Sequence, residues 1–198
     1  MPGSGSRFRV VLASSSPRRR YLMELLGIEF QVDPALGEER VFQGENPGEA
    51  AVRLATQKAS EVSSRRPEDV VVGADTLVVL DHLVLGKPAT AKEAREMLEA
   101  LSGRTHVVVT GVTVAQASTG RVEQGFERTL VEFDVLCPGV IEAYVATGEP
   151  MDKAGAYAIQ GRGSVLVKGI SGCYFNVVGL PLRRLSQMLA QFGVRVLG

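Results

Sequence analysis

The alternation of apolar and polar positions predicts a chain of mixed strands and helices. FRVVLA at 8–13 and DVVVGAD at 69–75 are β-branched apolar runs of the length of a buried strand, and the second is expected to end at Asp75. IEFQVD at 28–33 alternates like a half-buried strand. HVVVTGVTVAQA at 106–117 and RTLVEFDVL at 128–136 predict a long antiparallel pair.

Helices are predicted where a cap residue precedes a segment with helical spacing. Serines followed by Pro17 begin a helix over about 17–27, which Gly27 ends. Asn46 and Thr90 cap helices over about 47–64 and 92–101, each with a glutamate at the capping-box position. Further helices are expected at 138–148 and 181–192. Strands that alternate with helices indicate an α/β chain.

Turns and a short hairpin connect these elements. TLVVL and LVLGK, separated by Asp81 and His82, predict a hairpin in which Thr76 faces Lys87, beside Asp75. A turn-rich stretch is expected at 118–125, between the two long strands. MDKAGAYAIQGRG reads as a glycine-rich loop, and SVLVKGI after it reads as a strand.

Composition and charge narrow the class of protein. A hydrophobic content of 45% among 198 residues is enough to build a core, and it argues against disorder. Lys+Arg and Asp+Glu both number 22, so no overall field recruits a nucleic acid polymer or an anionic membrane. No apolar run is long enough to cross a bilayer, and MPGSGSRFRV is neither a signal nor a transit peptide. We therefore expect a cytoplasmic protein whose residues 1–7 form a flexible tail.

An arginine cluster at the start of the first helix is unfavourable for stability. Arg18–Arg20 lie at the positive end of the helix dipole, which disfavours cations. The arginines could be solvated or could pair with acids such as Glu24. Three of them after the serine loop Ser14–Ser16 instead favour a bound oxyanion, because helix-end N–H groups and guanidinium forks suit phosphate geometry.

Other charged residues extend this picture to several phosphates. Lys58 and Lys87 are each weak candidates alone, whereas Asp75 follows a strongly apolar strand, a common place for a functional carboxylate. Asp75 could bind a divalent cation or take a proton from water, and Glu38 or Glu39 could complete a hard-metal site. The sequence does not divide these roles.

Several familiar chemistries are excluded or left open. LGKP lacks the glycine and the Ser/Thr of a phosphate-binding P-loop, and the serines have no nearby histidine to act as a base. Gln160 offers an amide donor and acceptor that could read the imide edge of uracil or thymine, or could contact solvent in a surface turn. The two histidines are assigned to a turn and the core, and the two cysteines and the methionines to packing: His82, His106, Cys137 and Cys173.

Four motifs and a tail segment together resemble the Maf family of nucleoside triphosphate pyrophosphatases. They are, in order, LASSSPRRRYLMELLG, VVGADTLVVLDHLVLGKP, LSGRTHVVVTGV and GEPMDKAGAYAIQG, followed by NVVGLPL. The resemblance covers the chain from about Val10 to Leu189. It implies a single domain of two lobes over 1–198, with a mixed, twisted central sheet flanked by helices around a deep nucleotide-binding groove, as in inosine triphosphatase-like folds.

The same resemblance implies an activity and roles for residues. It implies a cytoplasmic, often dimeric hydrolase that uses Mg²⁺ or Mn²⁺ to convert a nucleoside triphosphate to the monophosphate and pyrophosphate. The family's general base falls on Asp75, and its loop acid, a metal ligand together with Asp75, falls on Glu39. Its other catalytic and substrate-binding positions fall on Lys58, Lys87, Ser14, Arg18, Arg19, Thr76 and Gln160.

The resemblance also narrows the substrate. In the family, the positions that match Arg18, Thr76 and Gln160 distinguish between substrates. The subgroup that this chain resembles, on the basis of SPRR, GADT and DKAGAYAIQG, acts on dTTP and UTP rather than on 7-methyl-GTP. Ala158 stands where many members have glycine, which stiffens the loop. Two alternatives remain: a nucleotide-binding regulator of septum formation with little hydrolysis, and a nucleotidyl transferase that uses an acceptor instead of water.

Overall fold

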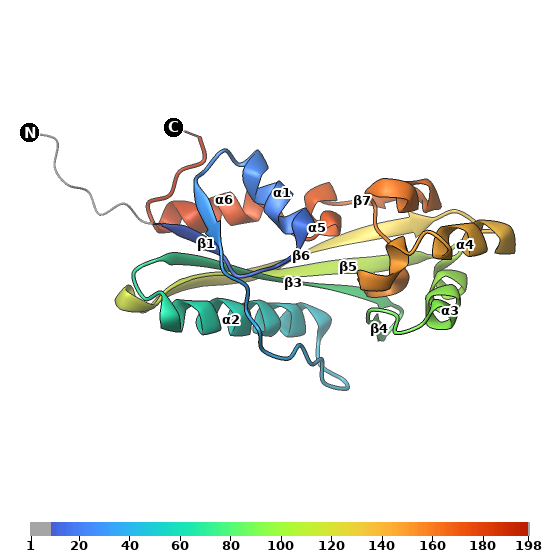
Figure 1. The fold of residues 1–198 in the computed structure, drawn as a ribbon, viewed down its shortest axis with the longest axis horizontal. Coiled ribbons are helices and arrows are strands. Elements are labelled where there is room, and N and C mark those ends of the chain that lie inside the picture. Colours follow the sequence, from blue (N-terminus) through green and yellow to red (C-terminus); the bar gives the residue numbers. More distant parts are fainter. Residues whose placement is uncertain (1–8, 198) are drawn as a thin grey trace, which may run out of the picture.

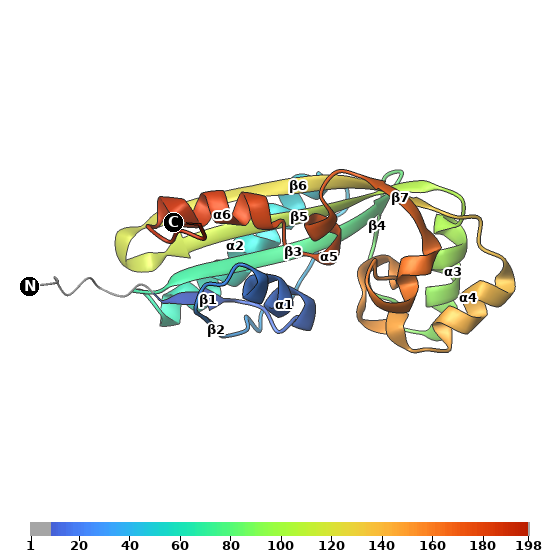
Figure 2. The ribbon, with the colours of Figure 1, turned by 90° about the horizontal axis from the view of Figure 1, so that it is seen from above.

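A mixed sheet of seven strands forms the centre of the fold, and the helices pack against it (Figures 1 and 2). The computed structural model describes residues 9–197, so the predicted tail at 1–7 lies outside the described residues. The strand order is β2-β1-β3-β5-β6-β7, with β4 paired to β3; β1 is parallel to β2 and β3, and the other pairs are antiparallel. The strands are β1 (Val10–Leu12), β2 (Phe30–Val32), β3 (Val70–Leu80), β4 (Leu83–Leu85), β5 (Thr105–Gln116), β6 (Arg121–Phe133) and β7 (Val167–Ser171).

Helices flank the sheet as predicted, and their caps explain where they begin. Ser16, Asn46 and Thr90 each accept a backbone N–H bond in the first turn of the following helix. The long helix α2 lies on one face, and α1, α5 and α6 lie on the other (Figure 1). The helices are α1 (Pro17–Leu25), α2 (Pro47–Arg65), α3 (Ala91–Leu101), α4 (Pro138–Val145), α5 (Tyr174–Val178) and α6 (Leu182–Gln191). None of the helices within 9–197 is both long and apolar enough to span a bilayer.

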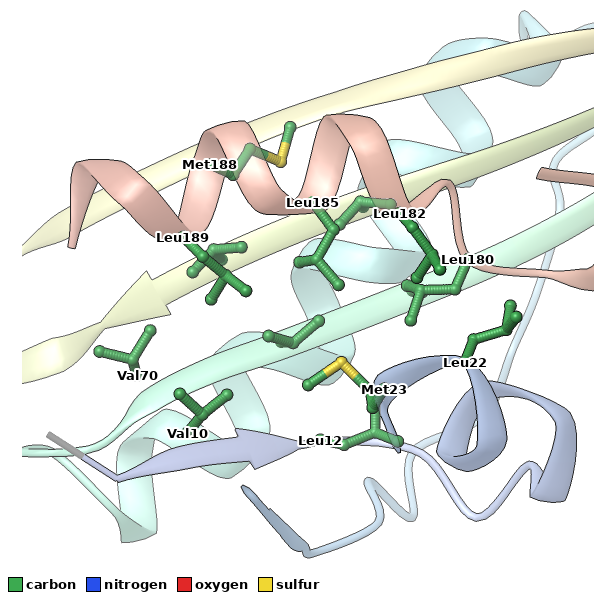
Figure 3. Close-up of a cluster of buried hydrophobic side chains, with 14 of the residues drawn as sticks. Val10, Leu12, Leu22, Met23, Val70, Leu180, Leu182, Leu185, Met188 and Leu189 are labelled. Carbon is green, nitrogen blue, oxygen red and sulfur yellow. The ribbon is translucent and has the colours of Figure 1, made fainter. Parts of the chain in front are cut away.

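Two of the apolar cores lie toward the two ends of the sheet and define two lobes, and two smaller ones lie between α2 and the sheet. In the first, the apolar stripe of α6 packs with α1 against β1 and β3; Leu12, Met23, Leu185 and Leu189 meet there (Figure 3). In the second, α3, α4 and the turns after them pack on the other ends of β3, β5 and β6 (Figure 2). The mixed, two-lobed α/β fold is thus confirmed.

Two predictions about strands were wrong. Strand β3 does not end at Asp75 but continues to Leu80, with Asp75 opposite Gly111 of β5. A charged side chain is tolerated in mid-strand because a lysine of α2 neutralises it. The stretch 118–125 is not turn-rich: a short turn at 117–119 and Gly120, which has a φ of +67°, reverse the chain, and β6 begins at Arg121.

The hairpin and the C-terminal segments also differ in part from the prediction. Leu80 pairs with Leu83 as expected, but β4 ends at Leu85, so Lys87 does not pair with Thr76. The β7 strand begins only at Val167, and the short helix α5 was not predicted. Cys137 is exposed before α4 rather than packed, because it lies in the extended connection where Pro138 starts the helix.

Candidate active site

A cleft of about 340 Å³ opens between the two lobes. It gathers residues from α1, α2, β3, the loop before α2, the segment after β4 and the turns after α4. Five cationic and three anionic side chains line it, so its lining is net positive although the whole chain is neutral. All nine predicted site residues lie in its wall: Ser14, Arg18, Arg19, Glu39, Lys58, Asp75, Thr76, Lys87 and Gln160.

The centre of the cleft is one ammonium held between two carboxylates. Lys58 Nζ lies 2.6 Å from Asp75 Oδ1 and 2.7 Å from Glu39 Oε1. Asp75 is 4% exposed and Lys58 is 9% exposed, so both charges have left water and depend on each other. Glu39 comes from the loop before α2 and is half exposed. This cluster joins the sheet, the helix and the loop at one point.

Two glycines in the sheet bring α2 close enough to form that cluster. A Cβ at Gly73 of β3 would lie 2.2 Å from the carbonyl oxygen of Ala55, and one at Gly111 of β5 would lie 2.2 Å from Ala51. The alanine-rich face of α2 therefore rests directly on the strand backbones. Lys58, one position before Ala59 on this buried face, consequently reaches the middle of β3.

Electrostatics keeps Glu39 ionised in spite of its partial burial. Burial raises the pKa of the Glu39 carboxyl, but the hydrogen bond and charge of Lys58 and the charges of Lys87 and Arg19 lower it by more. The net pKa of Glu39 therefore lies below its ordinary value. Lys87 acts here from the segment after β4, although it does not pair with β3.

Arg19 is held by acceptors on three sides. Its Nη2 donates to Thr76 Oγ1 at 3.0 Å, its Nη1 to Ser14 Oγ at 3.3 Å, and its Nε to the Gly179 carbonyl at 2.9 Å. Burial lowers the pKa of the Arg19 guanidinium, while the charges of Asp75 and Glu39 oppose that shift. The guanidinium is therefore fixed in place in the wall of the cleft.

The neighbouring arginines behave differently from one another. Arg18 faces across the cleft to Asp152 of the second lobe, with its Nη1 3.6 Å from a carboxylate oxygen. Arg20 points outward and pairs with Glu24 at 3.1 Å, one helical turn on. Arg18 and Arg19 thus line the cleft, where the predicted oxyanion site would lie, whereas Arg20 has the surface role that the sequence left open.

The opposite wall of the cleft is built from the glycine-rich turns after α4. Gln160 lies there with Tyr157 and Ala158. The fold at this point depends on a left-handed turn, with Gly155 at a φ of +69° beside Val78. Glu149 accepts the backbone N–H groups of Arg162 and Gly163 and thereby fixes the end of the segment that carries Gln160.

The two carboxylates fit a divalent metal only in company with a substrate. Within 9–197, no group of three His, Cys, Asp or Glu side chains could hold an ion. Asp75 and Glu39 nevertheless converge, each with one oxygen on Lys58. Because Mg²⁺ is commonly held by one or two carboxylates together with substrate phosphates, this donor pair suits such an ion.

The structure also places residues that the sequence left unassigned or did not single out. His82 lies in the β3–β4 turn and His106 in the second core, as predicted. Asp152, Lys153, Tyr157 and the Gly179 carbonyl line the cleft without having been singled out. All four belong to the motifs DKAGAYAIQG and NVVGLPL. The sequence analysis therefore identified the segments that line the cleft but not these individual residues.

Comparisons of the sequence with known proteins match nearly the whole chain. The family model described as Maf-like protein matches residues 9–192. A dTTP/UTP pyrophosphatase of Moorella thermoacetica is 53% identical over 96% of this chain and 98% of its own length. One of Pelotomaculum thermopropionicum is 50% identical over 95% and 98%. Among solved structures, a HAM1 protein from Coxiella burnetii has a TM-score of 0.44 and 19% identity over 64% of this chain and 73% of that chain.

Proposed function

Since the chain belongs to the Maf family, we propose that it hydrolyses dTTP and UTP to the nucleoside monophosphate and pyrophosphate. The observation that carries this proposal is the Asp75–Lys58–Glu39 cluster, with Asp75 and Lys58 buried, at the centre of a net positive cleft. Two carboxylates repel a triphosphate unless a cation lies between them. With a divalent cation they can hold the phosphates, and a carboxylate at this position can also accept a proton from water, which binding alone does not need.

In the proposed reaction, water adds to the α-phosphorus, and the bond between that phosphorus and the bridging oxygen to the β-phosphate breaks. The hydrogen bond from Lys58 occupies Oδ1 of Asp75 and fixes the carboxylate, which leaves Oδ2 to orient the water and accept its proton. The pyrophosphate departs with the electron pair of the broken bond.

The cations of the cleft bind the triphosphate and the leaving group. Arg19 is already oriented by three protein acceptors, so little entropy is lost when it meets a phosphate. Arg18, Lys87 and the N-terminus of α1 behind Ser14 add charge and N–H donors to the same cleft. Together they would neutralise the charge that grows on pyrophosphate.

A divalent cation, Mg²⁺ or Mn²⁺, fits this site through Asp75 and Glu39 together with phosphate oxygens. When bound, it would supply positive charge that polarises the α-phosphorus. Glu39 suits this role because the lowered pKa of its carboxyl leaves it ionised in moderately acidic solution. Its loop position would let it follow the substrate.

Gln160 would read the base. Its amide can donate to one group and accept from the next, which matches the imide edge shared by uracil and thymine. Cytosine presents an amino group and an unprotonated ring nitrogen where uracil has a carbonyl and an N–H, so an amide that keeps one orientation pairs less well with CTP. The hydroxyl of Thr76 is hydrogen-bonded to Arg19 and Thr110. Thr76 would therefore shape the cleft beside the phosphates and would not donate a hydrogen bond to the substrate.

Pyrophosphate release from UTP, dTTP, CTP, ATP, GTP and 7-methyl-GTP tests the proposal, with Mg²⁺ or Mn²⁺ and with chelator. Metal-dependent release that favours UTP and dTTP is expected. Release from 7-methyl-GTP in preference to UTP would contradict the substrate class. Binding without release from any triphosphate would point to a regulator, and release only with a second acceptor would point to a nucleotidyl transferase.

A further inference from the structure

Two of the quoted motifs contain none of the nine predicted site residues. LSGRTHVVVTGV includes Thr110 of β5, and NVVGLPL begins with Asn176 of α5. Both residues are fully buried, and neither belongs to the wall of the cleft. Burying a hydroxyl or an amide costs free energy unless the group is hydrogen-bonded, so the partners of these two side chains indicate what they do.

A chain of hydrogen bonds joins both residues to the cleft. Nη2 of Arg19 lies 3.0 Å from Oγ1 of Thr76, which lies 3.0 Å from Oγ1 of Thr110. Oγ1 of Thr110 lies 2.9 Å from the carbonyl oxygen of Asn176. Thr76 and Thr110 are opposite each other on β3 and β5, so the sheet sets the spacing of the two hydroxyls. The chain therefore runs from the cleft wall through the sheet to α5.

The chain of hydrogen bonds runs in one direction only. A carbonyl oxygen can only accept, so the carbonyl of Asn176 takes the single hydrogen of the Thr110 hydroxyl. Thr110 therefore accepts from Thr76, which uses the hydrogen of Thr76 as well. A guanidinium can only donate, so the oxygen of Thr76 meets Arg19 as an acceptor. Each hydroxyl hydrogen of the chain thus has one fixed place.

Asn176 holds the far end of the chain in place. Its Nδ2 donates to the carbonyl of Val108 at 3.0 Å and to Oγ1 of Thr129 at 2.9 Å. Thr129 in turn donates to the carbonyl of Cys173 and accepts the backbone N–H of Cys173. These bonds tie α5 and the residue before it to β5 and β6. The carbonyl that ends the chain is therefore fixed to the same sheet as the two threonines.

We infer that Thr110 is a positioning residue, because its hydroxyl compels Thr76 to accept a hydrogen bond from Arg19. A guanidinium has five N–H groups, and Ser14, Thr76 and the carbonyl of Gly179 use three of them. One N–H group is left on each terminal nitrogen, and such a pair suits two oxygens of a phosphate. The step from this orientation to turnover rests on the proposed function, whereas the orientation itself does not.

Thr110→Val and Thr110→Ser form a matched pair for the test. Valine keeps the shape of threonine but has no hydroxyl, so the hydroxyl of Thr76 is free to rotate and to point its hydrogen at Arg19. Serine keeps the hydroxyl and loses only the methyl group. We expect kcat/KM for UTP to fall about tenfold in Thr110→Val, mostly through a higher KM, and to stay within about twofold of the native value in Thr110→Ser.

A role in packing alone would give the opposite order. Thr110→Ser would then be the weaker enzyme, because it loses a buried methyl group, and Thr110→Val would be close to native. Thr113→Val is the control, since Thr113 is also fully buried on β5 but its hydroxyl bonds Thr56 of α2. It should leave kcat/KM unchanged. The packing order, or an equal fall in Thr113→Val and Thr110→Val, would overturn the inference.

The guanidinium itself gives a readout that needs no turnover. In a proton–nitrogen NMR spectrum of the full chain, the Nε–H group of Arg19 should give a signal that exchanges slowly with water, because it donates to a carbonyl, and Arg19→Lys identifies this signal by its loss. We expect the signal to shift and to exchange faster in Thr110→Val, and to keep its native position in Thr110→Ser and Thr113→Val. An unchanged signal in Thr110→Val would overturn the inference. If the native chain hydrolysed no triphosphate, the proposed function would fail, and this signal would still decide whether Thr110 orients Arg19.

Discussion

Two polar clusters lie against the central strands, one at Asp75 of β3 and one at His106 of β5, and only the first keeps its charges. Lys58, Asp75 and Glu39 form an ionised cluster that opens onto the cleft. Across the sheet's other end, His106 and Tyr157 form a neutral pair, with Nε2 and the hydroxyl oxygen 2.7 Å apart among the aromatic rings of the second core. Burial lowers the pKa of His106 to about 4 and raises that of Tyr157.

The difference shows what each cluster is for. A polar pair that only supports packing is least costly when it is neutral, because buried charge is expensive to desolvate. The charged cluster stays ionised in spite of the desolvation free energy, and it lies beside a cleft with additional cations. The charged cluster lies where an anionic ligand would balance the additional cations of the cleft. The neutral pair has no charge to balance and needs no ligand. Substitutions in the two clusters should therefore have different consequences.

Lys58→Met should have the largest effect of these changes. It removes the cation between two carboxylates, so the pKa of Glu39 rises and Asp75 loses the bond that orients it. We expect pyrophosphate release from UTP to fall by about a hundredfold to ten-thousandfold. Lys92→Met on the surface of α3, where the side chain is 82% exposed, should leave the rate unchanged. A Lys58→Met variant that turns over normally would remove the cluster from the mechanism.

The neutral cluster should govern acid stability instead. His106 is neutral in the folded protein down to about pH 4, whereas in the unfolded chain it takes up a proton below about pH 6.5. Its stabilising contribution is complete above pH 6.5 and falls by about 3 kcal/mol as the pH drops to 4. Urea unfolding across this range should give a flatter pH dependence for His106→Gln than for the native chain. His82→Gln in the exposed turn should keep the native slope.

A side chain added between α2 and the sheet should push α2 away from the strands and so disturb the charged cluster, because α2 carries Lys58. Gly111→Ala would place a methyl group into the backbone of Ala51, and we expect a loss of at least about 2 kcal/mol in the free energy of unfolding. Gly139→Ala is the matched control, because nothing lies within 4 Å of its added Cβ. Equal stability of the two variants, measured by denaturant unfolding, would contradict the close approach of α2.

The smallest expected effect is on the choice of base. Gln160→Ala should reduce the preference for UTP over CTP by about tenfold, the loss of one hydrogen bond, with a smaller change in kcat. Gln191→Ala at the exposed end of α6 serves as the control. Unchanged discrimination between UTP and CTP in Gln160→Ala would refute base reading by this amide.

Local signals in the sequence predicted most of the fold. Caps and glycines placed the helices to within a few residues, because Ser16, Asn46 and Thr90 satisfy N–H groups that the helix itself leaves unpaired. The end of β3 could not be predicted, since Asp75 reads as a strand terminator until its partner Lys58 is known. Lys58 reaches Asp75 because glycines of the sheet and alanines of α2 let the helix approach the strands closely. Such a close approach produces no periodic pattern of apolar residues in the sequence.

The candidate site was predicted by a different route. Single lysines and acids were weak signals, and the resemblance of whole motifs brought together residues that the fold then placed in one cleft. Arg20 could not be separated from Arg18 and Arg19 by sequence, because helix geometry makes the three side chains point in different directions but does not say which direction faces the cleft. A shared position in the cleft does not by itself divide the catalytic roles, so substitution of single side chains has to assign them.

The most direct test measures UTP binding and UTP hydrolysis on the same preparation of Asp75→Asn. Asparagine keeps the shape of the side chain but cannot accept the proton from water, so binding should persist while pyrophosphate release falls at least about a hundredfold. Asp81→Asn is the control, since this carboxylate lies in the exposed β3–β4 turn. Normal release by Asp75→Asn, or loss of binding together with release, would contradict the account.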